Sequence, residues 1–216
     1  MTISVMLAKL SEGMVITLFL FVVTVVFSLP LGLIVSFGRM SKNKIIQSIV
    51  KVYISIMRGT PLMLQLMVIY FGPFYIFGIQ LSSTWKNYAV AIGFILNYAA
   101  YFAEIYRGGI ESMSPGQYEA AQILGYNKTQ TFVRIILPQV IKRILPSVTN
   151  ELITLVKDTS LAFTIGIMEM FTVSKALASA QANMVPYIFA GIFYYIFNFI
   201  VAFLMEKVEK KMNYYK

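Results

Sequence analysis

The stretch GMVITLFLFVVTVVFSLPLGLIVSFG, residues 13–38, contains no charged side chain. A helix that crosses the hydrocarbon core of a bilayer needs about 20 predominantly apolar residues, so this stretch is long enough to span a membrane. It is too long for the apolar part of a signal peptide, and no small-residue cleavage site follows it. We therefore expect a membrane-spanning helix that stays in the mature protein.

The rest of the chain repeats this pattern. Of the 216 residues, 58% are hydrophobic and only 12% are charged, a composition too apolar for an ordinary soluble domain. The apolar runs predict a single all-α transmembrane domain covering residues 1–216, with five spans. The spans are expected near 13–38, 60–79, 87–107, 147–166 and 184–206.

Basic residues predict how these spans are oriented. Most of the 18 Lys and Arg residues fall on one side of a five-span arrangement, and such residues accumulate on the cytoplasmic side of membranes. We therefore expect a multi-pass protein of the cytoplasmic membrane, with the N-terminus and the segments 80–86 and 167–183 outside. The segments 39–58 and 108–143 and the C-terminus are expected in the cytoplasm. The basic residues on that side, with Arg107 at the membrane interface, are Arg39, Lys42, Lys44, Lys51, Arg58, Arg107, Lys128, Arg134, Lys142, Arg143, Lys207, Lys210, Lys211 and Lys216.

Composition also excludes several classes of function. The chain has no cysteine and no histidine, so disulfides, thiol chemistry and the commonest metal ligands are excluded, and we expect no metal site. The net charge of +9 does not indicate nucleic-acid binding, because the basic residues flank apolar spans. No G-x-x-x-x-G-K-[ST] phosphate loop occurs in the sequence, so we expect no ATP hydrolysis by this chain.

An amphipathic segment precedes the second apolar run. Lys44, Lys51 and Arg58 recur every seven residues, and apolar residues fill the opposite face. This pattern predicts a helix that lies at the inner membrane surface or against the bundle. The sequence RGTP (58–61) should end it, because proline disfavours helical geometry in the preceding residue and is a good first residue of the next helix.

The polar stretch PGQYEAAQILGYNKTQTFVRIILPQ, residues 115–139, predicts the start of a short helix. Ser114 supplies a hydroxyl cap, Pro115 suits the first helical position, and the Gln117 amide can reach back to the cap. Gly125 supplies the end of this helix. The stretch therefore begins with a helix that stops at a glycine turn.

A second helix should follow the glycine turn. The capping pattern recurs at Asn127, and Pro138 is expected to end this helix. In the first helix, Ala120, Ala121 and Leu124 share one face, which is shallow enough for another surface to approach closely. A solvated linker would need neither the caps nor this face.

These motifs resemble a known family. EAAQILG (119–125), followed by FVRIILPQ (132–139), is similar to the EAA loop of ATP-binding-cassette importer permeases. RGTPLMLQL (58–66), YFAEIYRGGIESM (101–113) and VKDTSLAFTIG (156–166) resemble the polar amino acid group of those permeases, in the same order and spacing. The resemblance implies a type I importer fold and a non-enzymatic membrane subunit of an ATP-driven amino acid importer. It implies coupling to a separate ATPase through the 115–138 helices, at Gln117, Glu119, Ala120, Ala121, Leu124 and Gly125.

The resemblance also implies partners. Two ATPase subunits would carry ATP and Mg, so no cofactor is expected in this chain. An extracellular solute-binding protein, soluble or lipid-anchored, would deliver the amino acid. Five helices enclose little space, so a second permease subunit, identical or closely related, is expected to complete the pathway in the lipid membrane. No nucleic-acid partner is expected.

The fourth span carries the strongest candidates for substrate binding. Glu151 and Asp158 are seven residues apart and share a helix face, and a carboxylate in a low-dielectric pathway binds an ammonium group well. The competing interpretation is a structural ion pair, and Glu104 with Arg107 is expected to form such a local pair. Cationic, neutral polar and cystine-like amino acids are all compatible with this pattern. The candidate substrate-binding residues are Glu151, Asp158, Asn97, Gln65, Thr159 and Ser160.

Two other classes of function compete with the importer. A self-sufficient secondary carrier or channel could use the polar fourth span as an ion pathway, but it gives the capped helix pair no task. An intramembrane enzyme lacks a His, Cys or metal cluster. The importer accounts for both the polar fourth span and the capped helix pair. It is the hypothesis we carry forward.

Overall fold

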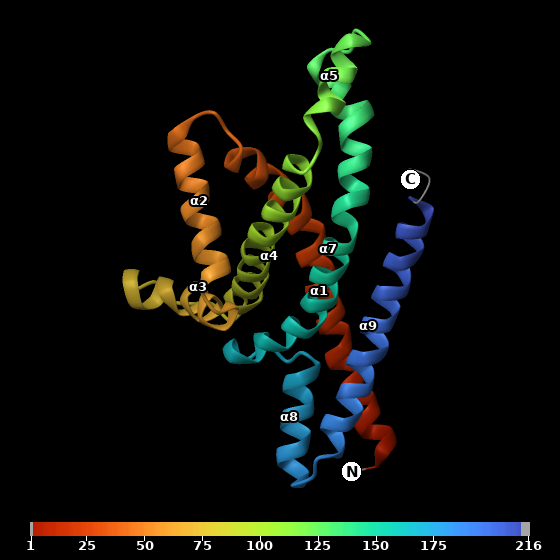
Figure 1. Cartoon of the computed structure of the whole chain (residues 1–216). Coiled ribbons are helices and arrows are strands. Elements are labelled where there is room, and N and C mark those ends of the chain that lie inside the picture. The colour runs from red at the N-terminus through yellow and green to blue at the C-terminus, as the bar shows by residue number, and fades with distance from the viewer. Residues whose placement is uncertain (1, 213–216) are drawn as a thin grey trace.

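The computed structural model describes residues 2–212, which form helices and short connections without any strand. The longest helices run side by side, and the N-terminal helix extends along most of the bundle (Figure 1). The predicted all-α architecture is confirmed. The elements are α1 (Ile3–Arg39), α2 (Lys44–Gly59), α3 (Leu62–Phe77), α4 (Trp85–Glu111), α5 (Pro115–Ile123), α6 (Lys128–Gln130), the π-helix η1 (Thr131–Ile136), α7 (Leu137–Asp158), the 3₁₀-helix η2 (Thr159–Ile165), α8 (Met170–Gln181) and α9 (Val185–Lys211).

Among the described residues, three helices are long and apolar enough to cross a membrane alone, namely α1, α4 and α9. Two further candidates are bent: α2 and α3 meet at 111°, and the segment from α6 to η2 meets α8 at 59°. Counting each bent pair as one span gives five, the number expected from the sequence, but the second of these includes α2, which belongs to the segment 39–58 that was predicted to be cytoplasmic. The predicted second span, 60–79, contains one helix, α3, which has only 16 residues and ends before Gly78, whose φ of 67° is left-handed; it is long enough for a span only together with α2.

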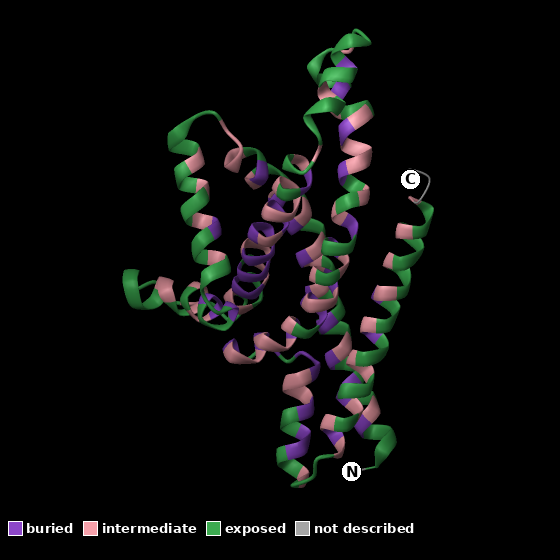
Figure 2. Ribbon diagram, in the orientation of Figure 1, coloured by how far each residue is buried: buried purple, intermediate pink, exposed green. Residues whose placement is uncertain are grey.

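The central helix of the bundle is α4. In its most apolar window 56% of the residues are buried, compared with 22% for α1 and 17% for α9, and Figure 2 shows the buried residues concentrated along it. Phe94, Tyr98 and Phe102 follow at intervals of four and are almost fully buried. This helix therefore contributes more buried residues than any other helix, and the faces of α1 and α9 that remain exposed are apolar enough for lipid.

One face of α1 is buried along its length and consists largely of small or hydroxyl-bearing residues. A Cβ added to Gly32 would lie 2.8 Å from the Phe102 Cβ and 3.1 Å from the Ala99 backbone oxygen, so the backbones of α1 and α4 approach closely there. The hydroxyls of Thr17 and Thr24 donate to carbonyls one turn back, at 3.1 and 2.7 Å, and the Thr17 Oγ1 also accepts from the Met170 N–H at 3.2 Å. The buried residues are Met6, Leu10, Gly13, Thr17, Leu20, Thr24, Ser28, Gly32 and Ser36.

The amphipathic helix α2 packs against the flank of α1 and α4. Asn43 caps it by accepting a hydrogen bond from the Ile45 N–H at 2.9 Å. Its apolar side reaches the bundle through Tyr53 and Ile54, so of the two predicted positions the structure shows the one against the bundle. The RGTP sequence breaks the helix as expected, with Pro61 extended immediately before α3.

The hairpin between α4 and α7 contains both the predicted turn and one wrong cap. Gly125 has a φ of 79°, which confirms the glycine stop, and Asn127 and Gln130 form the complete capping box at 2.9 and 3.0 Å. The Ser114 side chain makes no capping hydrogen bond; its carbonyl oxygen accepts from the Gln117 N–H instead. The predicted hydroxyl cap at α5 is therefore wrong, because the Gln117 N–H is bonded to the backbone carbonyl of Ser114 and not to its hydroxyl.

Pro138 does not end the second helix of the hairpin, contrary to the prediction. The helix runs from α6 through η1 into α7 without a break. Proline has no N–H and its ring clashes with the carbonyl four residues earlier in a regular α-helix. Immediately before it, the Leu137 N–H donates to the Phe132 oxygen, a π-type bond that spans five residues. This wider turn makes room for the ring, so the helix bends around the proline and continues.

The fourth predicted span contains a second break. The α-helix ends at Asp158, tightens into η2, and stops at Gly166 with a φ of 72°. The segment 167–183, expected outside, contains helix α8. Its cap is Glu169, which is fully buried and whose carboxylate accepts from the Thr172 N–H at 2.7 Å and from the Tyr194 hydroxyl at 3.0 Å. This carboxylate ties α8 to α9.

Candidate functional site

A cavity of about 340 Å³ lies where the two broken helices meet α4. The break between α2 and α3 contributes one wall, the last two turns of α7 contribute another, and α4 passes between them. Irregular backbone at membrane depth is tolerated where it lines a cavity. The lining residues are Thr60, Pro61, Leu62, Asn97, Tyr98, Tyr101, Glu151, Thr154, Asp158 and Leu161.

Asp158 is held by Tyr98. The Tyr98 hydroxyl donates to the Asp158 Oδ2 at 2.7 Å, and the ring is only 2% exposed. It lies along α4 next to Phe94 and Phe102, with ring centroids 6.5 and 6.3 Å away. Because the ring is packed on both sides, the hydroxyl has a fixed position and fixes the carboxylate of Asp158 at the cavity wall.

Glu151 lines the same cavity two turns earlier on α7. It is half-buried, and among residues 2–212 its carboxylate has no hydrogen-bonding partner or ion pair within contact distance. The structure therefore brings Glu151 and Asp158 to one cavity, as their spacing predicts, and does not pair Glu151 with a basic residue.

Asn97 and Gln65 hold the break between α2 and α3. The Gln65 Nε2 donates to the Met57 oxygen at 3.0 Å and to the Thr60 oxygen at 3.1 Å, and the Asn97 Nδ2 donates to the Met57 oxygen and to the Gln65 Oε1 at 3.0 and 2.9 Å. Asn97 lines the cavity, whereas Gln65 is not among the lining residues. Both amides satisfy carbonyls that the broken helix leaves unpaired.

Thr159 and Ser160 lie just beyond the cavity. The hydroxyl of Thr159 donates to the Val156 oxygen and that of Ser160 donates to the Lys157 oxygen, both at 2.7 Å. Neither residue lines the cavity. Their hydroxyls stabilise the tight η2 turn that follows Asp158.

Three residues in or beside the cavity have weak signals in the sequence. Tyr98 and Tyr101 belong to an aromatic series on α4 that is typical of packing. Arg58 follows the heptad spacing of surface lysines. The structure places Tyr98 and Tyr101 in the cavity wall and the Arg58 guanidinium 5.3 Å from the Tyr101 ring centre. The available signals were the position of Arg58 immediately before a predicted helix break and the spacing that puts Tyr101 on the same helix face as Asn97.

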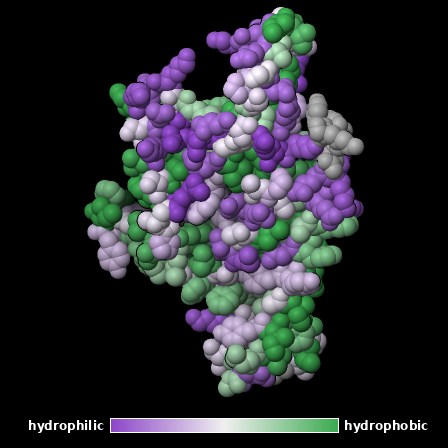
Figure 3. All heavy atoms as spheres, in the orientation of Figure 1, coloured by the Kyte–Doolittle hydropathy of each residue, from purple (hydrophilic) through white to green (hydrophobic). Residues whose placement is uncertain are grey.

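The helical hairpin protrudes from one end of the bundle, and Figure 3 shows hydrophilic residues gathered over that end. Of the predicted coupling residues, Ala121 is buried inside the hairpin, while Gln117, Glu119, Ala120, Leu124 and Gly125 are exposed. The predicted shallow face is therefore divided: Ala120 and Leu124 face outward and Ala121 faces inward. Ile123 and Leu124 are adjacent in the sequence and are 86% and 73% exposed.

A multi-pass helical bundle with a polar cavity at two helix breaks and an exposed hairpin at one end defines a membrane permease subunit. Residues 28–214 match the family described as "Binding-protein-dependent transport system inner membrane component", and the chain belongs to that family. It is a multi-pass component of the cytoplasmic membrane. In these systems the ATPase is a separate subunit, so this chain is not an enzyme, and the family implies an ATPase and a substrate-binding protein as partners.

Individual relatives cover nearly the whole chain. The putative glutamine transport system permease protein GlnP of Rickettsia conorii is 37% identical over 202 residues, 93% of this chain and 91% of that protein. The arginine transport system permease protein ArtQ of Bacillus subtilis is 38% identical over 203 residues, 94% of this chain and 91% of that protein.

Solved structures share the fold. A chain from the crystal structure of an amino acid ABC transporter with histidines superposes with a TM-score of 0.86 at 31% identity, covering 94% of both chains. An inward-facing MetNI methionine ABC transporter gives a TM-score of 0.74 at 17% identity, covering 99% of this chain and 100% of that chain. The type I importer permease fold expected from the sequence is confirmed.

Proposed function

We propose that this permease conducts an amino acid through the cavity between the two helix breaks. The observation that carries the proposal is the pair of carboxylates, Glu151 and Asp158, on the wall of one cavity whose remaining lining is neutral. An amino acid has an ammonium group, and a partly desolvated carboxylate is a strong partner for it. The names of the glutamine and arginine transport relatives support the same class of cargo.

The individual residues have different proposed roles. Glu151 and Asp158 contact the cationic group, and Asn97 contributes a polar edge of the cavity. Gln65 acts through Asn97 and the α2–α3 break, and Thr159 and Ser160 act by shaping the turn after Asp158. These are positioning roles, because their side-chain hydrogen bonds are made to protein groups.

We propose that the exposed hairpin contacts the ATPase. Leu124 and its neighbour Ile123 supply apolar contact area, Gln117, Glu119 and Ala120 lie on the exposed part of α5, and Ala121 and Gly125 maintain the shape of the hairpin. The hairpin is then on the cytoplasmic side, together with the C-terminus, and the N-terminus is outside. The concentration of Lys and Arg on that side supports this orientation.

The complete transporter in this proposal contains two permease subunits, identical or closely related, and two ATPase subunits. The cavity on one chain is partly open and would form one wall of a shared pathway. An extracellular binding protein, soluble or lipid-anchored, delivers the amino acid. ATP and Mg belong to the ATPase, and this chain holds no cofactor.

Uptake by the assembled transporter in proteoliposomes, with its ATPase and binding protein, tests the proposal. Glu151→Gln and Asp158→Asn keep shape and remove charge, so both should lower amino acid uptake by roughly tenfold or more with normal assembly, given the strength of charge-assisted contacts. Glu12→Gln, an exposed acid on α1 away from the cavity, is the matched control. Parental uptake in both cavity variants would refute the proposed site.

A further inference from the structure

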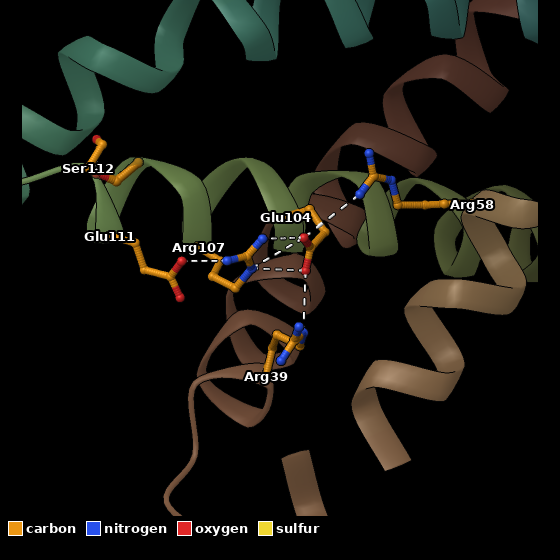
Figure 4. A network of polar contacts seen from close by, with 7 residues as sticks. Arg39, Arg58, Glu104, Arg107, Glu111 and Ser112 are labelled. Carbon is orange, nitrogen blue, oxygen red and sulfur yellow. Dashed lines mark hydrogen bonds and ion pairs between the residues drawn. The ribbon is translucent and has the colours of Figure 1, made fainter. Parts of the chain in front are cut away.

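A cluster of charged side chains lies beside the cavity, on the part of α4 nearer the hairpin (Figure 4). Its centre is Glu104, whose carboxylate is 2.7 Å from an Arg107 nitrogen, 3.6 Å from Arg39 and 3.8 Å from Arg58. Arg107 is also paired with Glu111. One carboxylate is therefore shared by guanidinium groups from α1, α2 and α4.

Arg58 is the most loosely held of the three arginines. It has the longest contact with Glu104, and its side chain is 44% exposed, compared with 23% for Arg39 and 27% for Arg107. Glu104 keeps two closer guanidinium partners without it. Breaking the contact between Arg58 and Glu104 therefore leaves no unpaired charge at Glu104.

The same guanidinium reaches the edge of the cavity. It lies over the ring of Tyr101, which lines the cavity, at 5.3 Å from the ring centre. Tyr101 and Glu151 line the same cavity, so the guanidinium lies at the edge of the space that Glu151 faces, and Glu151 has no hydrogen-bonding partner among residues 2–212. A half-buried carboxylate without a hydrogen bond is stabilised by a nearby cation, and Arg58 is a cation that the fold places at the edge of this cavity.

We propose that Arg58 is a tethered counter-cation of the cavity, shared between Glu104 and Glu151, that competes with the cationic group of the transported molecule for Glu151. This inference rests on the proposed function, because it assumes that Glu151 contacts the cargo. When the cargo's cationic group reaches Glu151, Arg58 is held by Glu104 alone. When the cargo leaves, Arg58 again balances Glu151. Tyr101 keeps the guanidinium at the cavity edge in both arrangements.

Charge selectivity follows from this role. The cavity wall carries two acidic side chains, Glu151 and Asp158, and Arg58 offsets one of them. Without Arg58 the cavity would have a stronger negative potential, which favours an amino acid with a cationic side chain over a zwitterion. For partly solvated charges the expected change in the uptake ratio is roughly threefold to tenfold.

The test compares uptake of L-arginine with uptake of L-glutamine in proteoliposomes that contain the complete transporter. Arg58→Gln should raise the arginine-to-glutamine ratio, whereas Arg58→Lys, which keeps the charge, should leave it near the parental value. Lys51→Gln is the matched control, because Lys51 is an exposed cation one heptad earlier on the same helix. The ratio should also stay at the Glu151→Gln value when Arg58→Gln is added to that variant.

Several results would overturn the inference. One is an unchanged arginine-to-glutamine uptake ratio in the assembled Arg58→Gln transporter. Another is an equal change of this ratio in Lys51→Gln or in Arg58→Lys. A third is a change of this ratio by Arg58→Gln that persists when Glu151 is also replaced by Gln. Loss of assembly in both Arg58→Gln and Arg58→Lys would make Arg58 a structural partner of Glu104 and would equally overturn it. Failure of the proposed function is distinguishable, because Glu151→Gln alone would then leave uptake unchanged.

Discussion

Replacing Gly32 by alanine should separate α1 from α4 and destabilise the bundle. The added Cβ would lie 2.8 Å from the Phe102 Cβ and 3.1 Å from the Ala99 backbone oxygen. Neither atom is the end of a flexible side chain, so the helices themselves must move. Overpacking of this kind costs about 1–3 kcal/mol. Alanine in place of glycine also stabilises a helix by up to about 1 kcal/mol through its higher helix propensity. The overpacking cost and this gain must therefore be measured separately.

Gly191→Ala separates them. Gly191 lies inside α9, and no atom of the described chain lies within 4 Å of the Cβ it would gain, so only the helix-propensity gain applies there. We expect Gly32→Ala to be less stable than Gly191→Ala by about 1–3 kcal/mol. Trp85 is the single tryptophan, and its Nε1 donates to the Tyr70 oxygen between α4 and α3 at 3.0 Å, so its fluorescence can follow unfolding of the detergent-solubilised protein. Equal stability of the two variants would refute the close-packing argument.

Four further results are expected. Gly125→Val should leave membrane insertion intact but reduce coupled ATP hydrolysis, because a β-branched residue is strained at a φ of 79°; retained substrate-stimulated hydrolysis would contradict the coupling role. Cysteines at Ser83 and Thr129 should react with an impermeant reagent from opposite sides of the membrane, and labelling of both from outside would contradict the orientation. Glu169→Ala should destabilise the permease by about 2 kcal/mol or more through unpaired donors at the start of α8, with Glu169→Gln intermediate in a thermal melt. Tyr98→Phe should lower kcat/KM for uptake by about tenfold without loss of stability, because only the hydroxyl that holds Asp158 is removed.

The features that could be predicted from the sequence are those fixed by short-range chemistry. The apolar length of residues 13–38, the glycine stop at Gly125 and the capping box at Asn127 each depend on residues within one or two helical turns. The same is true of the shared face of Glu151 and Asp158. Local backbone geometry fixes these features whatever surrounds them, so they are found where they were expected.

The features that could not be predicted depend on partners distant in sequence or on a choice between local solutions. The helix continues past Pro138 because a π turn accommodates the ring, and the sequence does not distinguish this solution from a helix end. Glu169 lies between apolar residues in sequence, and its role depends on Tyr194, 25 residues away. Arg58 looks like one more basic residue of an amphipathic helix until the fold brings Glu104 beside it.

The arrangement of polar groups around the cavity supports the proposal that Glu151 contacts the cargo. A helix broken inside a membrane protein leaves carbonyl oxygens without partners, and each unsatisfied group is costly there. At the α2–α3 break, Gln65 and Asn97 meet that need by donating to the Met57 and Thr60 carbonyls. At the end of α7, the hydroxyls of Thr159 and Ser160 donate to the Val156 and Lys157 carbonyls. Using these amides and hydroxyls as ligands would expose the broken backbone again. The Glu151 carboxylate makes no hydrogen bond to the described chain, so in the proposed function the cargo can bind it without breaking an existing contact.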